Sequence, residues 1–249
     1  MFLSKFKPKI TGSALIVIIF LFTSQAKSLD KFKKADHFSN YFSGILLLNE
    51  NQYEKSSNFL KRLDGLETSH LDYSKKYLYS LVNSGNLKKA FSYSKKLEKQ
   101  KIDSYESHLI TGIFYLKNSD IDLAKKYFQK AKLKNSRLIL NNYVSNSLFI
   151  WSNLGTYDLN KSIFELNKLD KRFENLKKIQ NVFLNCYFNS LQTNNLFKEL
   201  TSDEKIDFSR YYYFYASYLV NSKKTEKGKE IIDLALKFFP RNLLLNQYK

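Results

Sequence analysis

The sequence predicts an all-α protein built from stacked helical hairpins, and three observations lead to this fold class. Apolar residues recur every three or four positions rather than alternating, which is the period of an amphipathic helix and not of a strand. Only two prolines occur in 249 residues and 43% of the chain is apolar, so the chain can form long helices and bury a substantial core. Small residues and turn residues also return about every 34 positions.

The clearest hairpin is the stretch 111–131, TGIFYLKNSDIDLAKKYFQKA. Gly112 and Tyr115 belong to its first helix, and the turn Asn-Ser-Asp follows. Ala124, Phe128 and Ala131 are spaced four and three apart, so they share one face of the second helix. Small residues stand where the two backbones approach each other, and aromatic residues fill the space between them.

The same pattern repeats along the chain. Steps of 34 back from Ala124 reach Ala90 and Ser56, and Gly228 occupies the same slot further on. Asn160 and Asn194 are the expected anchors between them, which gives spacings of 34, 34, 36, 34 and 34. The predicted repeats are 37–70, 71–104, 105–138, 141–172, 175–205 and 208–240, and the other residues that define them are Gly44, Gly85, Gly155, Ala235 and Pro240. An irregular helical bundle with chance spacing is the alternative.

This spacing resembles the tetratricopeptide repeat, a helix-turn-helix unit of 34 residues. The resemblance implies a right-handed α-α superhelix, a solenoid of about six repeats with one continuous core. The stretch 105–138 departs from the template at two positions, because His108 replaces an aromatic residue and Ser136 replaces the closing proline. Residues 26–60 and the two following turns, SGN and NSD, also resemble exported tetratricopeptide proteins of alphaproteobacteria. That likeness implies a scaffold and names no ligand.

Residues 1–26 stand apart from the repeats. Lys5, Lys7 and Lys9 precede the uncharged apolar run 14–22, ALIVIIFLF, and a small-x-Ala exit ends at Ala26. This is the layout of a secretory signal, which predicts that residues 27–249 are periplasmic. The alternative is an uncleaved inner-membrane anchor facing the periplasm, which the lysines at 27, 31, 33 and 34 favour.

The net charge is +18, but 36 of the 41 basic residues are lysine rather than arginine, the residue that forks onto phosphate and guanine. Attraction to an anionic membrane surface or to acidic partners therefore explains the charge better than nucleic acid does. A nucleic-acid-binding solenoid would require the apolar run to be something other than an export signal. It stays the third hypothesis.

Motifs for catalysis, cofactor binding or metal binding are absent from the sequence. His37, His70 and His108 lie about one repeat apart without the spacing of a zinc site, and each is expected near a helix start. Cys186 is the only cysteine in the sequence, and we expect it to be a small core residue. Trp151 is expected to pack between helices. We therefore expect a protein that is not an enzyme, with no cofactor and no metal.

The resemblance implies that the first helices of successive repeats line a concave groove that takes an extended peptide or a helix of a partner protein. Carrying its inward positions across predicts a groove of Tyr41, Lys75, Tyr79, Ile113, Lys117, Phe149, Asn153, Tyr187, Arg210 and Tyr213. Tyr79 stands where a carboxylate clamp would need Asn, so clamping of a C-terminus is not expected. Residues 241–249 predict the start of a further helix capped by Asn242, and we expect the chain either to be cut short here or to rely on a partner at this end.

Overall fold

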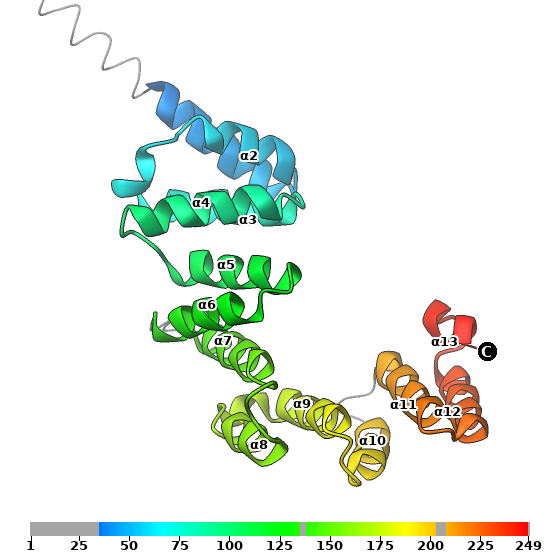
Figure 1. The fold of residues 1–249 in the computed structure, drawn as a ribbon. Helices are drawn as coiled ribbons and strands as arrows, with labels where there is room; N and C mark the ends of the chain where they lie inside the picture. The colour runs from blue at the N-terminus through cyan, green and yellow to red at the C-terminus, as the bar shows by residue number, and fades with distance from the viewer. Residues whose placement is uncertain (1–34, 135–137, 203–207, 249) are drawn as a thin grey trace, which may run out of the picture. The chain divides into compact units, whose positions relative to one another are not determined.

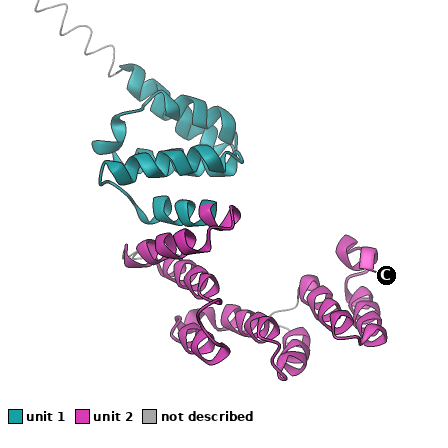
Figure 2. Cartoon of the chain, in the orientation of Figure 1, with its two compact units in different colours: residues 1–114 teal, residues 115–249 magenta. Residues whose placement is uncertain are grey.

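The computed structural model describes residues 35–134, 138–202 and 208–248, and its secondary structure is helical without a strand in these ranges (Figure 1). The signal or anchor predicted for residues 1–26 lies outside them. The chain forms two compact units, residues 1–114 and 115–249 (Figure 2). The boundary falls inside one helix, α5, and each unit is described by itself below.

The described part of unit 1 consists of two helical hairpins, the first of which opens with a helix over residues 35–49, and one further helix. Its further elements are α2 (Tyr53–Lys61), the short 3₁₀ helix η1 (Leu66–Thr68), α3 (Leu71–Asn83), α4 (Leu87–Lys99) and most of α5 (Tyr105–Lys117).

Unit 2 contains α6, three helical hairpins and a short last helix. Its elements are α6 (Ile121–Leu133), α7 (Ile139–Ser152), α8 (Leu159–Asn167), the 3₁₀ helix η2 (Lys171–Phe173), α9 (Glu174–Tyr187), α10 (Thr193–Ser202), α11 (Ser209–Asn221), α12 (Thr225–Phe238) and α13 (Leu243–Tyr248). The side chain of Asn242 accepts the Leu245 amide at 3.1 Å, as expected of a residue that caps the last helix.

Three buried residues spaced four and three apart, beginning with a small one, mark each second helix, and in α2 and α8 the third of them lies in the turn that follows the helix. The six sets are Ser56, Leu60 and Leu63; Ala90, Ser94 and Leu97; Ala124, Phe128 and Ala131; Ser162, Leu166 and Leu169; Thr193, Phe197 and Leu200; and Gly228, Ile232 and Ala235. In the first hairpin the small residue allows the two helices to approach closely, because the Ser56 hydroxyl donates to the Gly44 carbonyl at 2.8 Å.

Two of the expected anchors are wrong. Asn160 is exposed and Asn194 is only half-buried, and the buried small residues are instead Ser162 and Thr193. The turn before α8 is longer than the others and ends at Asp158, whose carboxylate accepts the Lys161 amide at 2.7 Å and fixes the helix start. The anchor spacings therefore become 34, 34, 38, 31 and 35.

Five hairpin turns end the first helix with one residue in the left-handed conformation, at Asn51, Gly85, Ser119, Asn189 and Lys223. In each turn the next amide bonds back to a carbonyl five residues earlier, at 2.8–3.0 Å. This is the Schellman arrangement that satisfies the end of a helix. Only one of these five residues is a glycine. In the other four turns a residue with a side chain adopts a conformation in which glycine would be less strained. Gly155 and Pro240 both lie in exposed turns.

The core of unit 1 is unusually rich in tyrosine. Tyr73 is fully buried, and its hydroxyl donates to the Leu60 carbonyl at 3.0 Å. Tyr77 contacts both Tyr73 and Tyr93, with ring centroids 6.0 and 4.8 Å apart. Burial raises the pKa of Tyr93 to about 12. These hydrogen-bonded rings fix α3 between α2 and α4.

In unit 2, Trp151 packs against the core, and most of the aromatic run over residues 211–215 of α11 lies within it. The Trp151 indole donates to Gln180 at 2.9 Å, so the ring packs between helices as expected. In the run, Tyr211, Tyr212 and Tyr215 are buried, whereas Phe214 is 40% exposed.

Candidate functional site

The first candidate surface lies on the first helices α3 and α5 of unit 1. Lys75, Tyr79 and Val82 follow one another at intervals of four and three on the exposed side of α3, and Tyr79 and Val82 are 52% and 41% exposed. On α5, Ile113 is 37% exposed, and Glu106 lies 3.7 Å from Lys75. We call these residues, Lys75, Tyr79, Val82, Glu106 and Ile113, the α3–α5 face.

The α3–α5 face is held on rigid supports. The opposite side of α3 carries the buried tyrosines, and α5 is fixed to α4 by Phe114, whose ring stacks on Phe91 with centroids 3.9 Å apart. Tyr79 also contacts the Tyr53 ring at the start of α2, with centroids 6.0 Å apart. The exposed side chains therefore stand on helices whose other faces are packed, which limits the entropy lost when a partner binds.

The Lys75–Glu106 pair is exposed, with side chains 51% and 36% accessible. Such surface pairs contribute roughly 0–1 kcal/mol. A carboxylate on a partner could therefore take over Lys75 at little cost. The face is apolar and aromatic with one exchangeable lysine. This combination suits an apolar peptide that carries some acidic character.

Tyr41, the remaining expected groove residue of unit 1, is half-buried. Its ring lies 5.1 Å from that of His70. Burial and the nearby Asp72 carboxylate raise the pKa of Tyr41. The side chain supports the start of α3 more than it extends the α3–α5 face.

In unit 2 one of the expected groove residues, Asn153, is buried. Asn153 is only 2% exposed, and its amide donates to the Phe149 carbonyl at 2.6 Å, so its side chain is not available to a partner. The prediction that Asn153 lines the groove is therefore wrong. Asn153 follows the last residue of α7, and its side chain is buried in the turn. Exposed or half-buried positions remain at Lys117, Phe149, Tyr187, Arg210 and Tyr213. Tyr213 packs against Tyr248, with ring centroids 5.3 Å apart.

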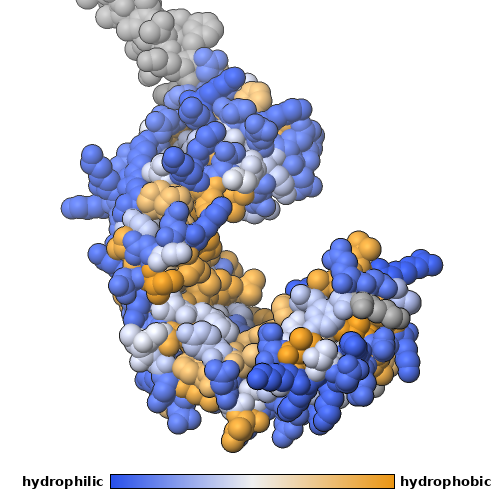
Figure 3. Space-filling model, turned by 45° about the vertical axis from the view of Figure 1, so that its right-hand side comes forward, coloured by the Kyte–Doolittle hydropathy of each residue, from blue (hydrophilic) through white to orange (hydrophobic). Residues whose placement is uncertain are grey.

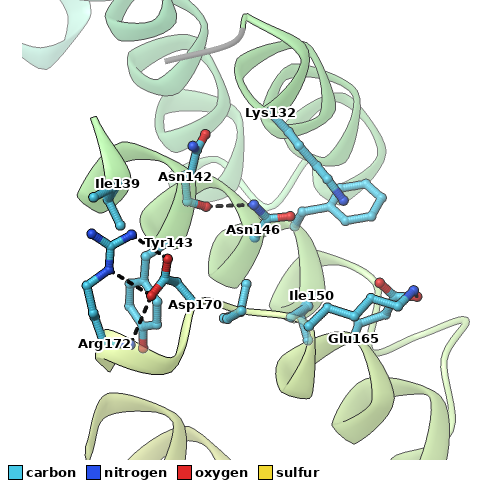
Figure 4. Close-up of a pocket in the computed structure, with 12 residues that line it drawn as sticks. Lys132, Ile139, Asn142, Tyr143, Asn146, Ile150, Glu165, Asp170 and Arg172 are labelled. Atoms are coloured by element: carbon cyan, nitrogen blue, oxygen red, sulfur yellow. Dashed lines mark hydrogen bonds and ion pairs between the residues drawn. The ribbon is translucent and has the colours of Figure 1, made fainter. Parts of the chain in front are cut away.

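A second candidate surface is a pocket of about 450 Å³ between α6, α7, α8 and η2 (Figure 4). Asn146 lies in its wall. With the corrected register this position is equivalent to His108, where the repeat template has an aromatic residue. A short amide in place of a large ring leaves the space open. The small residue at position 146 is visible in the sequence, but it aligns with His108 only when the anchor of the fourth repeat is Ser162 rather than Asn160.

The pocket has an apolar floor and a charged rim. Ile139, Ile150 and Leu169 line it, and Figure 4 shows Asp170 and Arg172 close to Tyr143, away from Lys132 and Glu165. The guanidinium of Arg172 is 2.6 Å from Asp170 and lowers the pKa of that carboxyl.

The two lysines at the rim are also engaged within the protein. Lys132 lies over the Phe149 ring at 5.0 Å, and Lys168 pairs with Glu165 at 2.9 Å. The rim charges are thus largely balanced within the protein. The pocket can seat one apolar side chain of a partner.

The titratable residues singled out in the sequence have structural contacts. His70 caps α3 by accepting the Tyr73 amide at 3.2 Å, and His108 is buried 2.8 Å from Asp103. Burial raises the pKa of the Cys186 thiol, which makes it less reactive. Across the described ranges no group of three His, Cys, Asp or Glu side chains could hold a metal ion.

Comparison with solved structures gives the fold. A tetratricopeptide repeat protein from Parabacteroides merdae superposes with a TM-score of 0.65 at 12% identity, over 81% of this chain and 79% of that one. The chain has the tetratricopeptide-repeat fold. The protein pilF of Pseudomonas aeruginosa is similar at a TM-score of 0.54 and 11% identity, over 86% of this chain and 97% of that one.

A chain in the Cut9–Hcn1 hetero-tetramer of the APC/C is similar to this chain at a TM-score of 0.57 and 11% identity. The match covers 85% of this chain, which spans 41% of the length of that one. No protein-family model and no curated protein sequence matches the chain.

Proposed function

We propose that this tetratricopeptide-repeat chain is a non-enzymatic scaffold that binds a peptide or a helix of a partner protein. The α3–α5 face carries the proposal, because Tyr79, Val82 and Ile113 are exposed on helices that the core holds rigidly. Apolar patches also lie among hydrophilic side chains on the surface seen in Figure 3. The chain of similar fold in the Cut9–Hcn1 hetero-tetramer is part of a protein assembly, which is in keeping with this role.

The partner segment should be apolar with at least one carboxylate. Tyr79 and Ile113 offer ring and aliphatic surface, and Lys75 offers a cation once it leaves Glu106. Burying apolar area supplies affinity, and the single charge selects orientation. The scaffold would then hold its partner by a short segment rather than by a whole domain.

The proposed location is the bacterial cell envelope, and it rests on residues 1–26 of the sequence. A basic start, the apolar run 14–22 and the exit at Ala26 are the support for export to the periplasm. If the run is retained, the protein is instead an inner-membrane-tethered assembly factor that uses the same face. Within the described residues no helix combines the length and apolarity needed to cross a membrane.

The location is tested by expressing the chain with a C-terminal tag in a bacterium, fractionating the cells and measuring the N-terminus by mass spectrometry. A periplasmic product that begins near Lys27 supports the exported scaffold. A membrane-bound product that keeps Met1 supports the tethered factor. A cytoplasmic product would overturn both and return attention to the basic surface.

The binding face is tested by affinity capture from periplasmic extract with three forms of the protein. Tyr79→Glu combined with Ile113→Glu places two charges on the α3–α5 face, whereas Ser92→Glu places a charge on exposed α4 of the same unit. The proposal expects a partner that the unmodified chain and Ser92→Glu both retain and the face variant loses. Equal retention by all three forms would reject the α3–α5 face.

A further inference from the structure

The helix over residues 35–49 exposes an apolar stripe. Phe38, Phe42 and Leu46 follow at intervals of four and are 64%, 64% and 59% exposed. The two phenyl rings stack with centroids 6.5 Å apart. Gly44 and Leu48, on the other side of this helix, are already buried in unit 1. The helix is therefore apolar toward the core and apolar toward the outside.

The repeat register shows what this stripe would do in the middle of the array. Two repeats later, Phe42 and Leu46 correspond to Ile110 and Phe114 of α5. Ile110 is 8% exposed, and Phe114 stacks on Phe91 of the preceding helix α4. The equivalent face of an inner repeat is covered. On the helix over 35–49 the same positions carry large apolar side chains and, among the described residues, have no such cover.

Two features of the sequence ahead of this helix identify the cover. The uncharged run 14–22 has no polar face, so it suits a bilayer rather than a surface helix that would pack on the stripe. Residues 27–34 then carry four lysines and one aspartate. Clustered lysines are attracted to anionic lipid headgroups.

We propose that the helix over residues 35–49 docks on an anionic membrane surface through Phe38, Phe42 and Leu46. This inference rests on the envelope location in the proposed function. It places the first repeat at the bilayer. The apolar stripe and the positive net charge of the chain supply the two weak signals that together give stable attachment to an anionic membrane.

The experiment reads the depth of this helix with a fluorophore. Cys186→Ser removes the native thiol, and Ser39→Cys places a label beside the stripe on its exposed side while leaving all three apolar residues. A second protein carries the label at Ser92 on α4 as the matched control. The full chain is added to vesicles of phosphatidylcholine, with or without phosphatidylglycerol, that contain nitroxide-labelled lipid.

The proposal expects quenching at position 39 in vesicles with phosphatidylglycerol, little quenching at position 92, and about tenfold weaker vesicle binding when Phe38→Glu and Phe42→Glu are combined. Circular dichroism establishes that this variant is folded. Absence of quenching at position 39 overturns the proposal, whether or not a concentration-dependent dimer shows that a second copy covers the stripe. Equal quenching at both positions also overturns it, since the lysines alone would then hold the protein. The assay needs no protein partner, so its failure leaves the α3–α5 face untouched.

Discussion

Gly228 offers a sharp test of the repeat packing, because two opposing effects act on the same substitution. It is the small residue at which α12 approaches α11. A methyl group added there would lie 2.9 Å from a Val220 methyl group and 3.1 Å from the Ala216 carbonyl oxygen. The valine can rotate, but the backbone oxygen moves only if the two helices separate. Gly228→Ala therefore tests whether α11 and α12 pack as closely as the structure shows.

The magnitude follows from the two effects. Alanine is more favourable than glycine inside a helix by about 1 kcal/mol. Overpacking a tight contact costs about 1–3 kcal/mol. We expect Gly228→Ala to lower the free energy of unfolding by about 1 kcal/mol, which for a chain of this size lowers Tm by about 2–4 °C.

Thermal unfolding followed by circular dichroism at the helical band measures this change. Gly155→Ala in the same unit is the control, because Gly155 lies in an exposed turn with no atom within 4 Å of the added methyl group. That control should be neutral or slightly stabilising. If Gly228→Ala instead raises the stability by about 1 kcal/mol, then α11 and α12 are not in close contact and the packing argument is wrong.

Three further substitutions test other parts of the structure by chemical unfolding. Gly85→Ala should cost about 1 kcal/mol, because Gly85 has a φ of +76° in its turn. Lys223 has a φ of +61° at the equivalent turn of the last hairpin, so Lys223→Gly should stabilise by up to about 1 kcal/mol. Glu67 is fully buried and pairs with Lys96. Burial alone would raise the pKa of Glu67, but hydrogen bonds from Lys96 and from the Gly65 amide have the larger effect and lower this pKa. A lowered pKa in the folded state stabilises above the unfolded value of 4.5 and is lost as the pH falls through the folded value. Glu67→Gln should thus cost about 1–3 kcal/mol at pH 7 and progressively less below pH 4.5.

Each of these has a result that would count against it. A neutral Gly85→Ala would mean that the turn adopts another conformation. Destabilisation by Lys223→Gly would show that the lysine side chain makes a contact that outweighs its strained backbone. A cost of Glu67→Gln that stays constant between pH 7 and pH 3 would mean that the charge of this carboxylate does not stabilise unit 1.

The sequence was enough to predict the helical hairpins and the tetratricopeptide-repeat fold, because small residues and apolar faces encode close helix packing directly. It failed where turn length varies. The spacing rule placed anchors at Asn160 and Asn194, but capping by Asp158 delays α8 and moves the anchor to Ser162. The start of α8 is therefore set by the hydrogen bond between the Asp158 carboxylate and the Lys161 amide, and not by the 34-residue spacing.

The candidate surfaces were harder to predict than the fold. Tyr79 and Ile113 are exposed as expected, because their neighbours on the helix supply enough core. Asn153 was misplaced because a residue that ends a helix can be buried by its own turn. The pocket beside Asn146 was missed because it arises from a side chain that is too small, and a spacing pattern does not register missing volume.

The most direct test of the account is photo-crosslinking in living cells. A photoreactive amino acid replaces Tyr79 in one protein and Ser92 in another, and both positions are exposed in unit 1. We expect a defined protein adduct from position 79, identified by mass spectrometry as an apolar segment with an acidic residue, and none from position 92. Adducts from position 92 but not from position 79 would contradict the claim that the α3–α5 face is the binding surface.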